Sequence, residues 1–227
     1  MTKSINILST KKLLPHQKQL LVDSTISVIE ENFIETKSKN FELSKVNDNL
    51  IFSSQNAVKS VLNNPKKEEF ITKLRDKNVF CVGLKTKNIL EENGFNVLVD
   101  ADYSSDLAEI ISLIYNKESY TFFCGNLRRE ILPNTLKENG ITFNEIEVYE
   151  TKLIPKKITT KLDGILFFSP SAVESYLKSN TIKNEICFCI GETTAEALEE
   201  KEIHNIIIAE EPSVENVIDE VITYYNN

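Results

Sequence analysis

DGILFFSPSAVESYL, from Asp163 to Leu177, predicts a strand, a tight polar turn and a helix in immediate succession. Its apolar run, Ile165 to Phe168, is typical of a strand that is buried on both faces of a parallel sheet. The next residues, Ser169 to Ser171, end the strand and begin the helix, so its free backbone amides point at the edge where open α/β sheets bind ligands. We therefore expect a binding loop at Ser169 and Ser171.

The same design occurs earlier in the chain. NLIFSSQNAVKSVL, from Asn49 to Leu62, aligns without gaps on residues 164–177, and FCVGLKTKNILEE from Phe80 aligns on FCIGETTAEALEE from Phe188. A period above 100 residues is too long for a solenoid repeat. The repeat therefore predicts two similar domains, each alternating strands with helices.

Two segments are candidates for the connection between these domains. Residues 25–34 are rich in β-branched residues and too long for one strand of a compact sheet, so we expect them to leave the first domain. ITFNEIEVYETKLIP, from Ile141, alternates apolar and polar residues over about a dozen positions and is expected to cross back. Paired together, these segments would form a two-stranded connection with Tyr149 close to the hinge.

The predicted fold class is therefore α/β: two flavodoxin-like domains with parallel sheets, joined by a two-stranded β linker, the second domain inserted into the first. The expected boundaries are residues 1–32 and 152–227 for a discontinuous α/β domain, 38–146 for the inserted α/β domain, and 33–37 and 147–151 for the crossover linker strands.

Composition limits the partners. The chain has 227 residues, of which 41% are hydrophobic, enough for two small cores. No apolar run approaches the roughly 20 residues that span a bilayer, and the start, MTKSINILSTKK, reads as a strand rather than a signal peptide, so a cytoplasmic protein is expected. The net charge of -8 argues against nucleic acid or an anionic membrane as a partner. An acidic ligand would have to be held by local features.

The four cysteines lie in apolar, strand-like runs. Cys187 and Cys189 point to the same face of one strand, and this C-F-C pattern would allow a metal site. Because the only histidines are His16 and His204, buried reduced thiols are the preferred interpretation.

No dinucleotide-binding, Walker, zinc-protease or serine-hydrolase motif occurs in the sequence. What remains is a set of hydroxyls, amides and backbone N–H groups at predicted helix starts. Facing each other across a hinge, they would form a ring of donors suited to a large ligand with several carboxylates. These residues are Ser53, Ser54, Gln55, Asn56, Lys85, Thr86, Gly125, Asn126, Ser169, Ser171, Thr193 and Thr194, with Gly125 and Asn126 expected to cap a helix that Pro133 interrupts.

Six motifs in this order resemble the uroporphyrinogen-III synthase family over nearly the whole chain: FSSQNAV, CVGLKT, VYETKL, LFFSPSAVESYL, CIGETTAEALEE and PSVENVI. The resemblance implies a cytosolic lyase without a cofactor that closes hydroxymethylbilane, a linear polycarboxylate, into uroporphyrinogen III while inverting ring D through a spiro intermediate. It also implies two α/β domains with the substrate between them, and hand-over of the substrate from hydroxymethylbilane synthase. Two domains with polar helix faces are compatible with the monomer that we expect.

Residue by residue, the resemblance places Tyr149, in VYET, where the family has a tyrosine that helps the hydroxyl group to leave. It places Thr193, Ser169, Thr86 and Ser54 at cleft-lining positions, and their neighbours Thr194, Ser171 and Asn56 complete the expected substrate-binding set. The sequence departs from bacterial relatives, which often carry Arg after the first strand, at Lys11 and Lys12, and Ser53 stands where the family usually has Thr.

Each candidate also has a purely structural interpretation. A serine at a helix start commonly serves as an N-cap, a tyrosine on a long strand commonly packs, and Arg128 and Arg129 fit a solvated helix face as well as a substrate carboxylate. A non-catalytic two-domain protein that binds a small anionic ligand explains the same donors. A flavodoxin-like FMN carrier is disfavoured because the chain has no Trp and no Gly-rich or Thr-rich phosphate loop.

Overall fold

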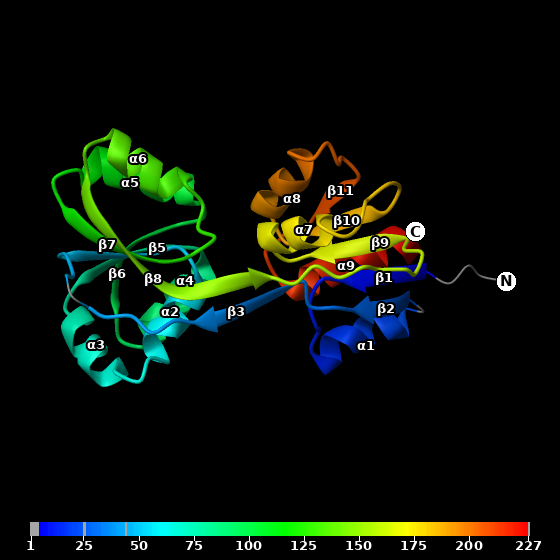
Figure 1. Cartoon of the computed structure of the whole chain (residues 1–227), viewed down its shortest axis with the longest axis horizontal. Helices are drawn as coiled ribbons and strands as arrows, with labels where there is room; N and C mark the ends of the chain where they lie inside the picture. The colour runs from blue at the N-terminus through cyan, green and yellow to red at the C-terminus, as the bar shows by residue number, and fades with distance from the viewer. Residues whose placement is uncertain (1–4, 25, 44, 227) are drawn as a thin grey trace. The chain divides into compact units, whose positions relative to one another are not determined.

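A computed structural model describes residues 5–24, 26–43 and 45–226 of the chain. It contains two compact units: the discontinuous unit, Met1–Glu35 with Lys152–Asn227, and the inserted unit, Thr36–Thr151. Each unit has a mainly parallel sheet with helices on both faces (Figure 1). This confirms the predicted fold class. Over the described ranges, no helix has the length and apolar character that a membrane crossing requires.

The discontinuous unit has a five-stranded sheet in the order β11-β10-β9-β1-β2, in which each strand pairs in parallel with its neighbour. Read from β2 and numbered in chain order within the unit, the strand order is 2-1-3-4-5, the flavodoxin-like arrangement. Its elements are β1 (Ile5–Ser9), α1 (Pro15–Asp23), β2 (Ile26–Glu30), β9 (Gly164–Phe167), α7 (Pro170–Leu177), β10 (Ile186–Cys189), α8 (Glu192–Glu199), β11 (Ile206–Ile208) and α9 (Val214–Asn226).

Alternating side chains of these strands pack into two hydrophobic cores, one on each face of the sheet. Ile165, Phe167 and Cys187 pack on the face covered by α7 and α8. Leu166 and Phe188 pack on the opposite face, covered by α1 and α9. A strand that is buried on both faces needs apolar residues at every position, and this explains the continuous apolar runs in the sequence.

The inserted unit has a six-stranded sheet in the order β3-β8-β7-β4-β5-β6. Helices α2, α3 and α4 cover one face and α5 and α6 the other. Its elements are β3 (Ile34–Ser38), β4 (Asn49–Phe52), α2 (Gln55–Leu62), α3 (Lys67–Leu74), β5 (Asn78–Val82), α4 (Leu84–Glu92), β6 (Asn96–Ala101), α5 (Ser104–Ile114), β7 (Ser119–Gly125), α6 (Ile131–Glu138) and β8 (Thr142–Leu153).

The sequence repeat corresponds to a structural repeat. Strands β4, β5 and β6 occupy the places that β9, β10 and β11 occupy in the other sheet, and β7 and β8 occupy the places of β1 and β2. The two units thus share one strand arrangement, but the strand that comes first along the chain differs between them.

The expectation that residues 25–34 cross directly between domains is wrong, although Thr25 itself lies outside the described residues. Ile26–Glu30 forms β2, which pairs in parallel with β1 inside the discontinuous unit. The chain then turns at Phe33, which is fully buried, donates its N–H to the Thr10 carbonyl and packs on the Tyr176 ring at 5.4 Å between centroids. This aromatic anchor divides the β-branched run into two short strands.

The predicted pairing of the connecting strands is confirmed, with β3 and β8 as neighbours. Ile154 donates its N–H to the Phe33 carbonyl at 2.8 Å, and Lys39 donates to the Val148 carbonyl at 2.9 Å. A later residue of β3 thus pairs with an earlier residue of β8, so the two strands are antiparallel. The Thr36 and Thr151 hydroxyls lie 3.3 Å apart between these two bonds.

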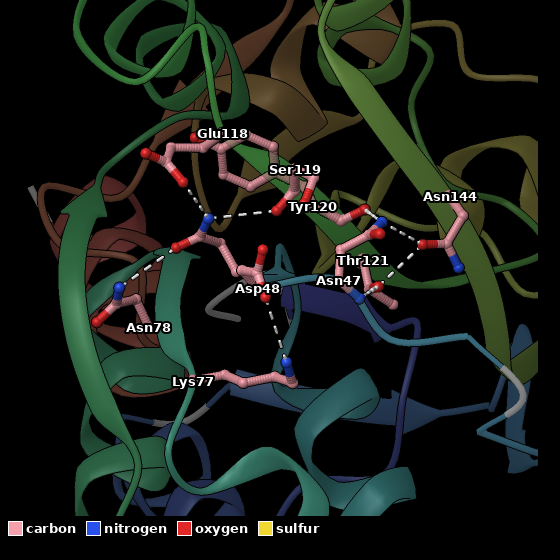
Figure 2. A network of polar contacts seen from close by, with 10 residues as sticks. Asn47, Asp48, Lys77, Asn78, Glu118, Ser119, Tyr120, Thr121 and Asn144 are labelled. Carbon is pink, nitrogen blue, oxygen red and sulfur yellow. Dashed lines mark hydrogen bonds and ion pairs between the residues drawn. The ribbon is translucent and has the colours of Figure 1, made fainter.

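A polar network pins the amino ends of the strands in the inserted unit (Figure 2). The buried hydroxyl of Thr121 accepts the Asn47 N–H at 2.9 Å and donates to Asn144 Oδ1 at 2.9 Å. Further along the edge, the first residues of three adjacent strands form an amide ladder, Asn49, Asn78 and Asn96. Because a slip of one residue would break all these bonds, the network fixes the register of the sheet.

We predict that Thr121→Val lowers the free energy of unfolding by about 1–3 kcal/mol, because the N–H of the half-buried Asn47 loses its acceptor while the shape of the Thr121 side chain is kept. Urea unfolding followed by circular dichroism measures this loss. The control is Thr142→Val, at an exposed position of β8, which should stay within about 0.5 kcal/mol of the parent protein. Equal stability of the Thr121 variant and the parent would contradict the register role.

Candidate functional site

The carboxyl ends of the central strands in the inserted unit gather several predicted site residues. Parallel pairing places Phe52 beside both Cys81 and Phe123, and Gly125 beside Tyr149. The loops that follow these strands therefore begin at one sheet edge. These loops and the helix starts that follow them carry Ser54 and Asn56 after β4, Thr86 after β5, and Asn126 after β7.

Ser54 is the N-cap of α2, as its sequence position suggests. Its backbone is extended, and its Oγ accepts the Asn56 N–H at 3.1 Å. The Asn56 side chain is exposed. The Ser54 hydroxyl also lowers the pKa of the Tyr149 phenol, so one short side chain acts on both the helix start and the tyrosine.

Tyr149 is half-buried on β8 and packs against the core of α2, α3 and α4. Burial raises the pKa of its phenol, and the Ser54 hydroxyl opposes this rise. The phenol is consequently protonated at neutral pH and can donate a hydrogen bond or a proton. A phenolate base would require a lowered pKa, which this surrounding does not provide.

The expected role of Asn126 as a helix cap is wrong. Helix α6 begins five residues later, at Ile131, and Pro133 lies within its first turn, where a proline is tolerated because no backbone bond is lost there. Asn126 instead bonds the backbone of Thr151: its Oδ1 accepts the Thr151 N–H at 2.7 Å, and its Nδ2 donates to the Thr151 carbonyl at 3.1 Å.

Arg128 is held in ion pairs with Glu130 and Glu145. Hydrogen bonding to Glu145 is the main cause that raises the pKa of its guanidinium. Since both carboxylates already engage its donors, Arg128 serves the loop structure in this arrangement rather than a ligand.

The discontinuous unit presents a second set at its own carboxyl edge. Ser169 is the N-cap of α7; its Oγ accepts the Ala172 N–H at 3.2 Å and lies 3.1 Å from the Ser171 hydroxyl. The Lys11 ammonium lies 4.7 Å from the centre of the Phe168 ring, within cation–π range. The Lys12 side chain is exposed.

The GLKT and GETT motifs place equivalent threonines at the starts of α4 and α8. Thr86 is 4% exposed and Thr194 is 1% exposed, whereas Thr193 is half-buried. The Thr194 hydroxyl has no hydrogen-bond partner in the described part of the chain. Both buried threonines contribute to helix packing, and an unpaired buried hydroxyl such as that of Thr194 is uncommon in proteins.

Residues 17–219 match the family model described as uroporphyrinogen-III synthase HemD. The chain belongs to this family. The family predicted from the six motifs is therefore confirmed, and with it an enzyme of the cyclising lyase type in haem biosynthesis.

Individual members of this family share less than a quarter of their residues with this chain. The uroporphyrinogen-III synthase of Saccharomyces cerevisiae is 24% identical over 180 residues, a match that spans 66% of this chain and 66% of the yeast protein. The structure of uroporphyrinogen-III synthetase from Helicobacter pylori has 23% identity and a TM-score of 0.68, covering 97% of this chain and 99% of that chain. A mutant uroporphyrinogen III synthase from Thermus thermophilus has 13% identity and a TM-score of 0.77, covering 98% and 99%.

The four cysteines of this family member are buried free thiols. Burial raises the pKa of Cys81, Cys124 and Cys187 to about 12, and raises that of Cys189 as well. Within the ranges that the structure describes, no group of three or more His, Cys, Asp or Glu side chains gathers in a metal-binding arrangement.

We predict that these thiols react slowly with a disulfide reagent at pH 8. A pKa of about 12 leaves only about one thiol in 10⁴ as thiolate at that pH, and burial blocks access. Absorbance of the released chromophore measures the rate, and the same protein in denaturant should react at the rate of free cysteine. A native thiol that reacts as fast as the denatured ones would contradict this assignment.

Proposed function

We propose that this chain closes hydroxymethylbilane to uroporphyrinogen III, inverting ring D through a spiro intermediate. The proposal rests on membership of the uroporphyrinogen-III synthase family together with one observation, a half-buried tyrosine at the carboxyl edge of the inserted sheet. This residue is Tyr149, which matches the family's tyrosine.

The first step is the loss of the terminal hydroxyl group. Tyr149 donates its proton to this oxygen as the carbon–oxygen bond breaks, and water leaves. The phenolate regains a proton when a ring carbon loses its hydrogen at closure. The lone pair of the adjacent pyrrole nitrogen stabilises the resulting azafulvene cation. A donor with its pKa raised by burial stays protonated over the neutral range, so the step needs no charged acid.

The second task is orientation. The cation must meet the substituted carbon of ring D to give the spiro intermediate, which then fragments and recloses with the ring inverted. Because unassisted closure gives the non-inverted isomer, holding the two chain ends together is the main contribution of the protein.

Neutral donors are proposed to hold the substrate carboxylates. These are the hydroxyls and helix-start amides of Ser54, Asn56 and Thr86 in the inserted unit and of Ser169, Ser171, Thr193 and Thr194 in the discontinuous unit. The capping geometry of Ser54 and Ser169 supports this proposal because a capped helix start leaves further N–H groups for an anion. A monomeric, cytoplasmic enzyme that receives its substrate from hydroxymethylbilane synthase completes the proposal.

We predict that the purified chain, supplied with porphobilinogen and its deaminase, yields type III uroporphyrin after oxidation. Chromatographic separation of the type I and type III isomers is the measurement, and the deaminase alone, which should give type I, is the control. Only type I product in the presence of the chain would instead favour a non-catalytic protein that binds an anionic ligand.

We predict that Tyr149→Phe slows turnover by about 10²-fold, because general acid assistance is typically worth 10²–10⁴ in rate. The isomer ratio among enzymatic products should stay largely type III, since orientation does not depend on the phenol. The matched control is Tyr224→Phe, an exposed tyrosine of α9, which should keep the parent rate. An unchanged rate in Tyr149→Phe would remove this residue from the mechanism.

A further inference from the structure

Tyr149 does not lie on the sheet face that strand alternation assigns to it. Along β8, Phe143 packs on the face of α5 and α6, while Ile146 and Val148 pack on the face of α2, α3 and α4. A strict two-residue period would place Tyr149 with Phe143. Its ring instead joins Val148 on the α2 face, where Ser54 caps the helix.

A register shift explains this change of face. Cys124 is paired with Glu147, but the next residue of β7, Gly125, is paired with Tyr149, so β8 has one extra residue at this point. Such an irregularity is a β-bulge, which bends a strand and redirects its side chains. The bulge therefore turns Tyr149 toward Ser54.

Gly125 supplies the space that the redirected ring occupies. A Cβ built on this glycine would lie 2.4 Å from both Cε2 and Cζ of Tyr149, well inside van der Waals contact. The ring consequently rests directly on the Gly125 backbone. Every residue other than glycine would displace the ring or the strand.

The turn after Gly125 then fixes β8 on both sides of the tyrosine. Asn126 makes its two hydrogen bonds to the backbone of Thr151, two residues after the ring. Arg128, whose N–H closes the turn onto the Gly125 carbonyl at 3.2 Å, pairs with Glu145, four residues before it.

We propose that the turn Gly125–Arg128 is a positioning device for Tyr149: the glycine makes room for the ring, and Asn126 and Arg128 hold the bulged strand that aims the phenol at Ser54. This proposal deepens the proposed function. Its kinetic test rests on the assignment of Tyr149 as the proton donor. Asn126 touches no reacting group and acts through the strand.

The first test is kinetic. Asn126→Ala should lower kcat about tenfold with KM within about twofold, because a misplaced donor weakens the transition state rather than substrate binding. In the Tyr149→Phe background, the same change should alter kcat less than about twofold, since no phenol remains to be positioned. The matched control is Asn93→Ala, which removes another asparagine-to-backbone bond, at the end of α4, and should leave kcat unchanged.

An Asn126→Ala variant with the parent kcat, or one that loses the same factor in both backgrounds, would overturn the proposal. Gly125→Ala should lower kcat at least as much as Tyr149→Phe does, but this variant also risks misfolding. Asn126→Ala, which removes hydrogen bonds without adding bulk, therefore carries the test.

The second test needs no substrate and so separates this proposal from the proposed function. In protein with ¹³C at tyrosine Cζ, the Tyr149 resonance is the one lost in Tyr149→Phe. Asn126→Ala should shift this resonance and bring its titration midpoint closer to that of a free tyrosine, whereas Asn93→Ala should do neither. An unmoved resonance in Asn126→Ala would refute the positioning role even if the enzyme proves fully active.

Discussion

Parallel strand pairing is the constraint on which the rest of this structure depends. Because every strand in the centre of each sheet runs in the same direction, all loops that follow those strands begin at one edge. The pairing also buries both faces of the central strands, which requires the continuous apolar runs and leaves polar chemistry to the strand ends. Ser54 and Ser169 hold equivalent positions for this reason: each is the first polar cap after the central strand of its sheet.

The two units use one arrangement for different purposes. Strand β2 has five residues and ends at the sheet edge, whereas its counterpart β8 has twelve and continues as the antiparallel partner of β3. The additional length carries the bulge, Tyr149 and the threonine pair with β3. A repeat that is nearly symmetric in its helices and central strands is therefore asymmetric at the strand that carries the proposed acid.

Charge is distributed in a way that favours neutral donors for ligand binding. The chain carries a net charge of -8, and several cations near the strand ends of the inserted unit are already paired, with Lys39 bound to Glu147, Lys87 to Asp100 and Arg128 to Glu145. Exposed pairs of this kind add little stability, but they occupy the cations. Hydroxyls and helix-start amides then remain as binding groups that need no long-range attraction and match carboxylate oxygens one by one.

The sequence by itself determined the two α/β units, their parallel sheets and the structural equivalence of residues 49–62 and 164–177, because burial on both faces and helix capping are written in local residue types. It also indicated the family, through motifs that lie at the strand ends. The division of residues 26–38 into two strands was not readable, because it depends on Phe33 packing against Tyr176, a contact between distant parts of the chain. Only the tertiary structure decided the face of Tyr149 and the roles of Gly125 and Asn126. A bulge arises from the register between β7 and β8, and register is a property of two paired strands, which the alternation within one strand cannot show.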